Sequence, residues 1–203
     1  MTKVAFSNDA ALDEVTQDVI DLDGRPCANR EAGTNECNRK IMILRIYTII
    51  HTLISLVGIF TGLVVLFGML AGKRLDGWTK WFLITTVATS VTGFFFPFHG
   101  FTPAYAVGII SLLVLAVAIF ARYPRQLAGA WRWIYVVTAV IALYLNVFVG
   151  IVQAFLKVPA LHAMAPTQTE PPFKLTQLVV LALFVLLGIV AAIRFRADPI
   201  RAT

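Results

Sequence analysis

Long stretches of apolar residues with almost no charge are the feature that most constrains this chain. Five such runs lie at residues 43–71, 81–96, 104–121, 131–155 and 175–193. A helix rises about 1.5 Å per residue and a bilayer core is about 30 Å thick, so about 20 apolar residues cross it. The chain is 59% hydrophobic and 14% charged, whereas about 25% of the residues of a soluble domain are charged. The runs therefore predict an integral membrane protein.

The apolar runs lack the two-residue alternation of a membrane β-strand, and a helix satisfies its backbone polar groups within one segment. We therefore predict an all-α membrane bundle of about five transmembrane helices within residues 42–196. The run at 81–96 is only sixteen residues long, so it is the weakest candidate for a full span. Residues 197–203 are predicted to form a short cytoplasmic tail.

The amino-terminal segment, residues 1–41, differs in composition from the rest of the chain. Its first forty residues hold eight acidic and five basic side chains, and Gly24, Pro26 and Gly33 interrupt any regular pattern. We predict a polar, disordered tail. Met42 directly precedes the first apolar run, so a native start at Met42 and a native tail both stay open.

The two cysteines of the chain both lie in this polar segment. Cys27 and Cys37 are ten residues apart, a spacing that matches neither a CxxC redox pair nor half of a zinc ribbon. A disulfide between them requires an oxidising compartment. Whether they are bonded stays open at this point.

Basic residues near the ends of the apolar runs predict the orientation. Nine lie on the side reached at the end of the first run, namely Lys73, Arg74, Lys80, Arg122, Arg125, Arg132, Arg194, Arg196 and Arg201. Five lie on the other side, namely Arg39, Lys40, Arg45, Lys157 and Lys174. Because Lys and Arg concentrate in cytoplasmic loops, we predict an outside amino terminus and a cytoplasmic carboxyl terminus. We assign the basic residues to topology and anionic lipid contacts rather than to nucleic acid.

Polar side chains at bilayer depth are the candidate site residues. Asn146, Gly150, Gln153 and Lys157 recur at the spacing of one helix face, so they should face the protein interior or a wet cavity. Interhelical hydrogen bonding is the structural interpretation of this stripe, and a ligand-facing surface is the functional one. His51 and Ser55 form a second candidate face on the first run.

Gly58 and Gly62 continue the face of His51 and Ser55 as a GxxxG sequence. Small residues at this spacing let a second helix approach closely. We interpret the pair as a site of close helix packing. Self-association or contact with a partner protein through these glycines is the alternative.

Cofactor and catalytic motifs give little support to an enzyme. His51 and His99 are both predicted near the outer side, but His99 lies in a connection, which suits a haem clamp poorly. In the proline-rich outer loop, His162 and Glu170 are too few ligands for a metal site. No Walker loop, GxSxG or HExxH sequence occurs. We predict no cofactor and no metal. We favour a protein without enzyme activity over an enzyme.

The segment LAGAWRWIYVVTAVIALYLNVFV (127–149), together with QAFLKVPALHAMAPTQTEPPF (153–173), resembles a family of small multi-pass inner-membrane proteins of proteobacteria with no assigned activity. The resemblance covers roughly residues 45–196 and leaves out the tail. It implies a bacterial inner (plasma) membrane location. It implies no functional residue.

The predicted function is a non-catalytic membrane module that binds a lipid, a quinone-like molecule or a partner protein at the outer end of the bundle. The aromatic residues Phe94, Phe95, Phe96 and Phe98 would suit an apolar wall for such a ligand. A small oligomeric transporter or channel is the first alternative. A haem-containing redox component is the second.

Overall fold

The computed structural model describes residues 34–95 and 103–195, and helices are the regular structure of these two ranges. The helices are α2 (Thr34–Leu70), α3 (Asp76–Gly93), α4 (Pro103–Arg122), α5 (Trp131–Lys157), α6 (Pro159–Met164) and α7 (Pro171–Arg194). The chain divides into two units, Met1–Ile50 and His51–Thr203, so α2 begins in the first unit and ends in the second. The predicted all-α class is thus confirmed for the described residues.

Four of the described helices are long and apolar enough to cross a membrane. They are α2 from Asn38 onward, α4 from Tyr105 onward, α5 and α7. Helix α3 is not among them, although residues 81–96 were predicted as a span. Asp76, Lys80 and several threonines lower its hydropathy. Four helices of this kind, rather than the five spans expected, are compatible with the predicted multi-pass membrane protein.

In the first unit, the described residues form the start of α2. The helix begins at Thr34 and so extends into the segment predicted as a disordered tail up to residue 41. Adding a residue to an existing helix is far less costly than starting one, so the apolar run at 43–71 carries the helix beyond its own start. Met42, Ile43 and Ile46 are more than half exposed, as expected for side chains in contact with acyl chains.

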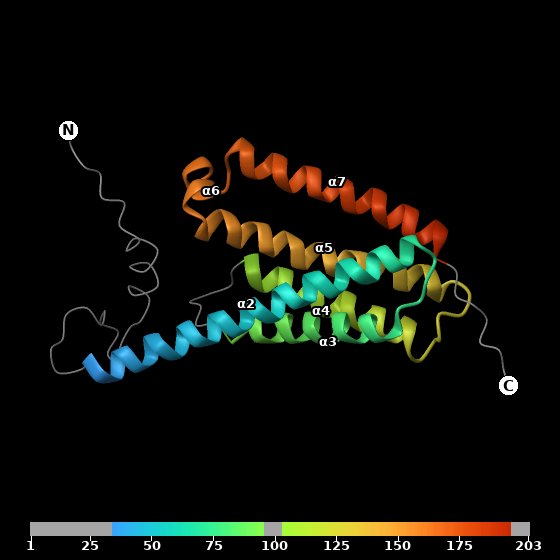
Figure 1. Ribbon diagram of the computed structural model, residues 1–203, viewed down its shortest axis with the longest axis horizontal. Coiled ribbons are helices and arrows are strands. Elements are labelled where there is room, and N and C mark those ends of the chain that lie inside the picture. Colours follow the sequence, from blue (N-terminus) through green and yellow to red (C-terminus); the bar gives the residue numbers. More distant parts are fainter. Residues whose placement is uncertain (1–33, 96–102, 196–203) are drawn as a thin grey trace. The chain divides into compact units, whose positions relative to one another are not determined.

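In the second unit, α5 is the helix around which the others pack. It contacts α3, α4, α6 and α7, and α3 also contacts α4. Figure 1 shows α3, α4, α5 and α7 running lengthwise beside one another, with successive helices in opposite directions. The short α6 lies in the proline-rich stretch that was predicted as a loop, and Pro159 in its first turn needs no backbone hydrogen bond there.

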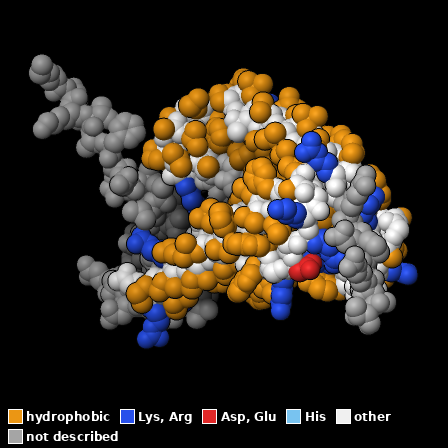
Figure 2. All heavy atoms as spheres, turned by 45° about the vertical axis from the view of Figure 1, so that its right-hand side comes forward, with side chains coloured by type: hydrophobic (Ala, Val, Ile, Leu, Met, Phe, Trp, Pro, Cys, Tyr) orange, Lys and Arg blue, Asp and Glu red, His pale blue; other side chains and the backbone are white. Residues whose placement is uncertain are grey.

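The surface of the described helices is mainly apolar. Large exposed residues include Phe60 and Phe67 on α2 and Leu178 and Ile193 on α7, each about 60% exposed or more. Figure 2 shows a face dominated by hydrophobic side chains, with few Lys or Arg and hardly any acidic residues. A water-soluble protein rarely exposes apolar patches of this extent. The surface therefore fits a lipid solvent.

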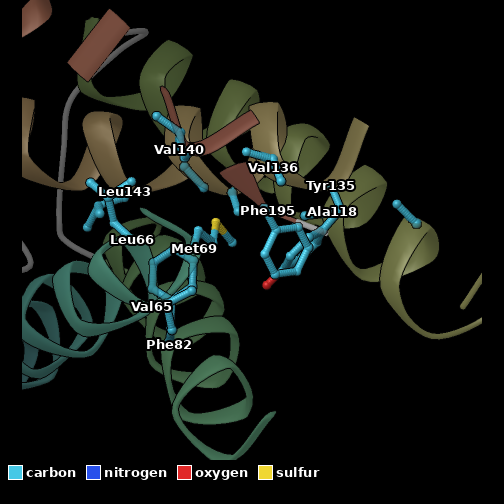
Figure 3. Packing of buried hydrophobic residues seen from close by; sticks show 14 of the residues in the cluster. Val65, Leu66, Met69, Phe82, Ala118, Tyr135, Val136, Val140, Leu143 and Phe195 are labelled. Carbon is cyan, nitrogen blue, oxygen red and sulfur yellow. The ribbon is translucent and has the colours of Figure 1, made fainter. Parts of the chain in front are cut away.

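The buried apolar core of the second unit lies toward one end of the bundle. Figure 3 shows its central members, which come from α2 (Val65, Leu66, Met69), α3 (Phe82), α4 (Ala118), α5 (Tyr135, Val136, Val140, Leu143) and the residue after α7 (Phe195). Tyr135 is fully buried, and its ring centroid lies 6.3 Å from that of Phe195.

Helices α2, α4 and α7 finish at this end of the bundle, and α3 and α5 begin there; we call it the basic end. Asp76 at the start of α3 pairs with Arg122 at the end of α4. A Cβ on Gly72, just after α2, would lie 3.4 Å from the carbonyl oxygen of Arg194 at the end of α7. Described basic residues at this end are Lys73, Arg74, Lys80, Arg122, Arg125, Arg132 and Arg194. Asp76 is the acidic residue among them.

Candidate functional site

Uncharged polar side chains from α2, α3 and α5 meet inside the second unit, and we call this group the polar seam. Its members are His51, Ser55, Thr85, Thr86, Thr89, Thr92 and Asn146. On α3, Thr86, Thr89 and Thr92 recur every three residues and Thr85 directly precedes Thr86, which places the four on one side of the helix. Thr85 and Thr86 are buried, and the others are half-buried. Three predicted candidates, His51, Ser55 and Asn146, are thus brought to one place.

Hydrogen bonds across the polar seam join α3 to its two neighbours. His51 Nδ1 lies 2.8 Å from Thr92 Oγ1, and the Ser55 hydroxyl donates to Thr89 Oγ1 at 3.4 Å. On the other side of α3, Asn146 Nδ2 donates to Thr86 Oγ1 at 3.5 Å. The first distance is short, and the other two are at the limit of hydrogen bonding. The seam therefore fastens α2 and α5 to α3.

The threonine hydroxyl hydrogens of the seam are largely committed within α3 itself. Thr92 donates to the Ala88 carbonyl and Thr85 to the Trp81 carbonyl, each at 2.7 Å. This return bond to the previous turn is usual for threonine in membrane helices. Because the Thr92 hydrogen is used in this way, the short contact with His51 requires a hydrogen on Nδ1. The ring is thereby held by a partner on a neighbouring helix.

The glycine pair of α2 lies at the crossing of the polar seam with the apolar core. A Cβ on Gly58 would lie 3.1 Å from Asn146 Nδ2, and one on Gly62 would lie 2.5 Å from Leu143 Cδ1 and 2.8 Å from Phe82. Both glycines thus serve close packing within the chain. Self-association through them stays a prediction, and it would require α3 and α5 to give up these contacts.

The seam ends at an apolar layer. Gly62, Leu66, Phe82 and Leu143 line a void of about 10 Å³ together with other apolar residues. A water molecule needs about this much space and two or more polar partners, which this lining does not offer. This void is therefore too small and too apolar to hold a ligand.

The predicted stripe on α5 is divided by the structure. Asn146 is part of the polar seam and Gly150 is half-buried against Ile59, whereas Gln153 and Lys157 are exposed. The 27 residues of α5 span roughly 40 Å at 1.5 Å per residue, which exceeds a bilayer core. A helix of this length would extend beyond the core at one or both ends.

At the end opposite the basic end, Glu170 is bound by its own loop. Its carboxylate accepts hydrogen bonds from the Thr167 hydroxyl at 2.8 Å and from the Thr167 and Thr169 backbone N–H groups. The Thr167 hydroxyl bond chiefly lowers the pKa of Glu170 below its ordinary value. His162 is exposed on α6. The described residues contain no group of three or more potential metal-ligating His, Cys, Asp or Glu side chains.

An ion-pair cluster at the basic end was not singled out from the sequence. Arg122 is only 5% exposed and pairs with Asp76, which also lies 3.7 Å from Arg74. The guanidinium carbon of Arg122 is 5.2 Å from the centre of the Tyr135 ring. We call Lys73, Arg74, Asp76, Arg122 and Tyr135 the basic cluster.

Two hydrogen-bond donors of the basic cluster are buried without an acceptor. The Tyr135 hydroxyl and Arg74 Nε make no hydrogen bond of normal geometry with the described chain. Figure 3 shows Tyr135 beside Phe195. Thr79, Arg74 and Arg122 line the same shallow recess as Tyr135. A buried donor without a partner is costly, and such donors often mark a site for a missing acceptor.

Several predicted features lie outside the described residues. His99, Phe96 and Phe98 belong to 96–102, and Cys27 belongs to 1–33. The side chain of Cys37 is also outside the description. The His51–His99 haem pair and the cysteine pair therefore stay as predictions. Of the aromatic wall, Phe94 packs against Tyr105 of α4 with ring centroids 5.5 Å apart.

Comparison with known proteins adds no relative. No protein-family model, no curated protein and no solved structure matches this chain. The resemblance to the proteobacterial family accordingly stays a prediction, and the function has to be argued from the geometry above.

Proposed function

We propose that this protein is a non-catalytic membrane module that crosses the bilayer five times and binds a lipid. The observation that carries the proposal is the mainly apolar exterior of the described helices, together with a void at the end of the polar seam that is too small for a ligand. A ligand of such a bundle comes from the bilayer and sits on its surface or at its ends. Buried donors without a hydrogen bond of normal geometry include three at the basic end, namely the Tyr135 hydroxyl and the Nε atoms of Arg74 and Arg132, and Gln168 Nε2 at the opposite end.

Helix α3 is the fifth crossing in this proposal. Its 18 residues extend about 27 Å, close to the thickness of a bilayer core. Its outward side chains are apolar, with Trp81, Ile84 and Val91 exposed, while Thr85 and Thr86 are buried against other helices. Mean hydropathy underrates such a helix because its polar side chains face protein rather than lipid.

We further propose that the basic end faces the cytoplasm of a bacterial inner membrane. Seven described basic residues and one acidic residue lie at this end, and Lys and Arg favour the cytoplasmic side. The bacterial location rests on the family resemblance. Fusing a cytoplasm-dependent reporter enzyme after Thr203 tests the orientation. An active fusion is expected, and a silent one together with activity of a periplasmic reporter would reverse it.

Native mass spectrometry of the purified protein, with identification of bound lipids and small molecules, tests the lipid-binding function. We expect phospholipid adducts that persist after detergent exchange, and no bound quinone or haem. Lipid-free protein across a series of mild detergents would overturn the proposal. A small molecule bound at a stoichiometric ratio in place of lipid would support a quinone-like ligand instead.

A small oligomeric transporter or channel is the second candidate, and the polar seam favours it. The seam lines up His51, Thr92, Thr89 and Asn146 from one end toward the middle, where Phe82 and Leu143 close it. If these two side chains form a gate, Phe82→Ser with Leu143→Ser should make proteoliposomes leak protons or small ions. Equal leakage for wild type and variant would remove this candidate.

A further inference from the structure

We infer that the basic cluster binds the phosphate group of an anionic phospholipid, with Arg74, Arg122 and Tyr135 as its donors. The inference rests on the proposed lipid-binding function and specifies the chemistry of the lipid. It concerns the basic end, where the sequence predicted general anionic lipid contacts for the basic residues, whereas the ligand site itself was predicted at the opposite end.

Arg122 provides a fixed cation for such a group. It ends α4, is almost fully buried, and stacks over Tyr135, with Tyr123 on another side at 6.0 Å. Asp76 accepts from one terminal nitrogen, Nη2. A guanidinium has five donors in a rigid fork that suits phosphate. Because Asp76 accepts from Nη2 alone, the other guanidinium N–H groups of Arg122 are donors for a phosphate.

Arg74 is placed beside Asp76 by the way α2 ends. Gly72 has a φ of +70°, which a residue with a side chain rarely adopts. The Lys73 N–H donates to the Gly68 carbonyl at 2.8 Å and the Gly72 N–H to the Met69 carbonyl at 3.0 Å. This pair of bonds is a Schellman motif. It turns the chain so that Lys73 and Arg74 follow the helix end directly and meet the start of α3.

The charge balance of the cluster leaves an excess of positive charge. Lys73, Arg74 and Arg122 are cationic, and among the described residues Asp76 is the one acidic side chain that pairs with them, at 69% exposure. A phosphodiester group carries one negative charge, so it reduces this excess without reversing it. The Tyr135 hydroxyl and Arg74 Nε, both buried without partners, supply uncharged and charged donors to the same recess.

The apolar side of the recess favours a phospholipid over free phosphate. Val65, Met69 and Phe195 line it together with Arg74, Arg122 and Tyr135. The recess lies at the ends of membrane-crossing helices, where headgroups are found. Anionic headgroups at such basic sites are a general mode of lipid recognition.

The test uses the full chain in nanodiscs and in native mass spectrometry, with phosphatidylglycerol as the anionic lipid and phosphatidylcholine as the zwitterionic one. We expect wild type to retain phosphatidylglycerol about tenfold more than phosphatidylcholine. Arg74→Gln and Tyr135→Phe should each lower this preference about fivefold, the loss that corresponds to about 1 kcal/mol per basic contact. The Tyr135 variant changes no charge, so its effect reports a specific donor.

Arg125→Gln is the charge-matched control for Arg74→Gln. Arg125 lies at the same end but stacks on Trp131 and Phe120, at 5.0 and 5.5 Å, outside the recess. Its replacement should alter the preference by less than about twofold, as expected for an exposed charge. Equal losses in the two arginine variants would mean diffuse attraction and would overturn the inference. Thermal unfolding in lipid-free detergent shows whether each variant is folded, and Arg74, at 25% side-chain exposure, is the tolerant position.

The remaining outcomes separate this inference from the proposed function. If wild type retains lipid without headgroup preference, the lipid-binding function stands and the phosphate site is wrong. If wild type retains no lipid at all, the proposed function itself is wrong. Inorganic phosphate at millimolar concentration should not displace bound phosphatidylglycerol. Full displacement, with binding of phosphate alone, would identify a soluble anion site and overturn the assignment to a lipid.

Discussion

The polar seam and the basic cluster are both groups of polar side chains in a largely apolar bundle, yet their hydrogen bonds differ. In the seam, His51, Ser55 and Asn146 each reach a hydroxyl of α3. In the basic cluster, the Tyr135 hydroxyl and Arg74 Nε are buried and reach no acceptor in the described chain. The first group is satisfied by neighbouring helices, and the second has donors to spare.

This difference separates a structural role from a binding role. Polar groups deep in a bilayer have no water to bond, so they are stable only when paired within the protein. Groups at the helix ends meet headgroups, which supply acceptors from outside the chain. The site candidates His51 and Asn146 thus connect helices, while basic residues that were assigned to topology and anionic lipid contacts carry the better ligand chemistry. The predictions below test this distinction.

The largest stability effect is expected where α2 crosses the seam. Gly62→Ala places a Cβ 2.5 Å from Leu143 and 2.8 Å from Phe82, so the free energy of unfolding in mixed micelles should fall by about 1–3 kcal/mol. Gly77→Ala is the matched control, because a Cβ there meets nothing within 4 Å. Equal effects at the two glycines would show that α2 does not pack closely on α3 and α5.

In the basic cluster, removing the unpartnered hydroxyl should stabilise the lipid-free protein. Tyr135→Phe keeps the buried ring and deletes a donor whose burial is not compensated. The free energy of unfolding in lipid-free micelles should therefore rise by about 1 kcal/mol. A loss of similar size would mean that Thr79 or Arg122 already satisfies this hydroxyl, and the cluster would then resemble the seam.

A double-mutant cycle measures how much one bond of the seam contributes. Asn146→Leu and Thr86→Val remove the two partners of the 3.5 Å hydrogen bond. Their coupling should be about 0.6 kcal/mol, the usual value for interhelical bonds in membranes. Lipid retention should be unchanged in both single variants. A variant that stays folded but loses its lipid preference would place the binding site in the seam.

The smallest effect is expected at Glu170, a carboxylate satisfied by its own loop. Its pKa is lowered, so the bonds from Thr167 and Thr169 are present at neutral pH and are lost as the pH falls through the folded-state pKa, below about 4.5. NMR titration of the Thr167 and Thr169 amides should show this transition. It should be absent in Glu170→Gln, and persistence there would assign it to another group.

The helical membrane class could be predicted from the sequence because long apolar runs admit few other structures. The ends of α4, α5 and α7 lie within a few residues of the predicted runs, where basic residues and prolines mark the boundaries. Helix α3 was harder, because its threonines face protein and lower the hydropathy that sequence analysis relies on. The start of α2 at Thr34 was missed for a related reason, since a helix can continue into polar residues.

The candidate site was only partly foreseeable. Periodicity grouped Asn146 with Gln153 and Lys157 on one face of α5, but it could not show that Asn146 is half-buried whereas Gln153 and Lys157 are exposed. The pairing of Asp76 with Arg122 joins residues 46 positions apart, and no local spacing indicates it. A usable signal was present, however, because alternating spans bring the start of α3 and the end of α4 to the same side.

The central claim is that α3 crosses the membrane with its threonines facing the other helices. The contrast between the polar seam and the basic cluster depends on it, and so does the proposed function. In a chain with Cys27→Ser and Cys37→Ser, single cysteines at Gly77 and Phe95 mark the two ends of this helix, and both positions are exposed. A membrane-impermeant maleimide should label Phe95→Cys on intact cells and Gly77→Cys only after permeabilisation. Labelling of both positions from the same side would show that α3 does not cross, and the five-span account would be wrong.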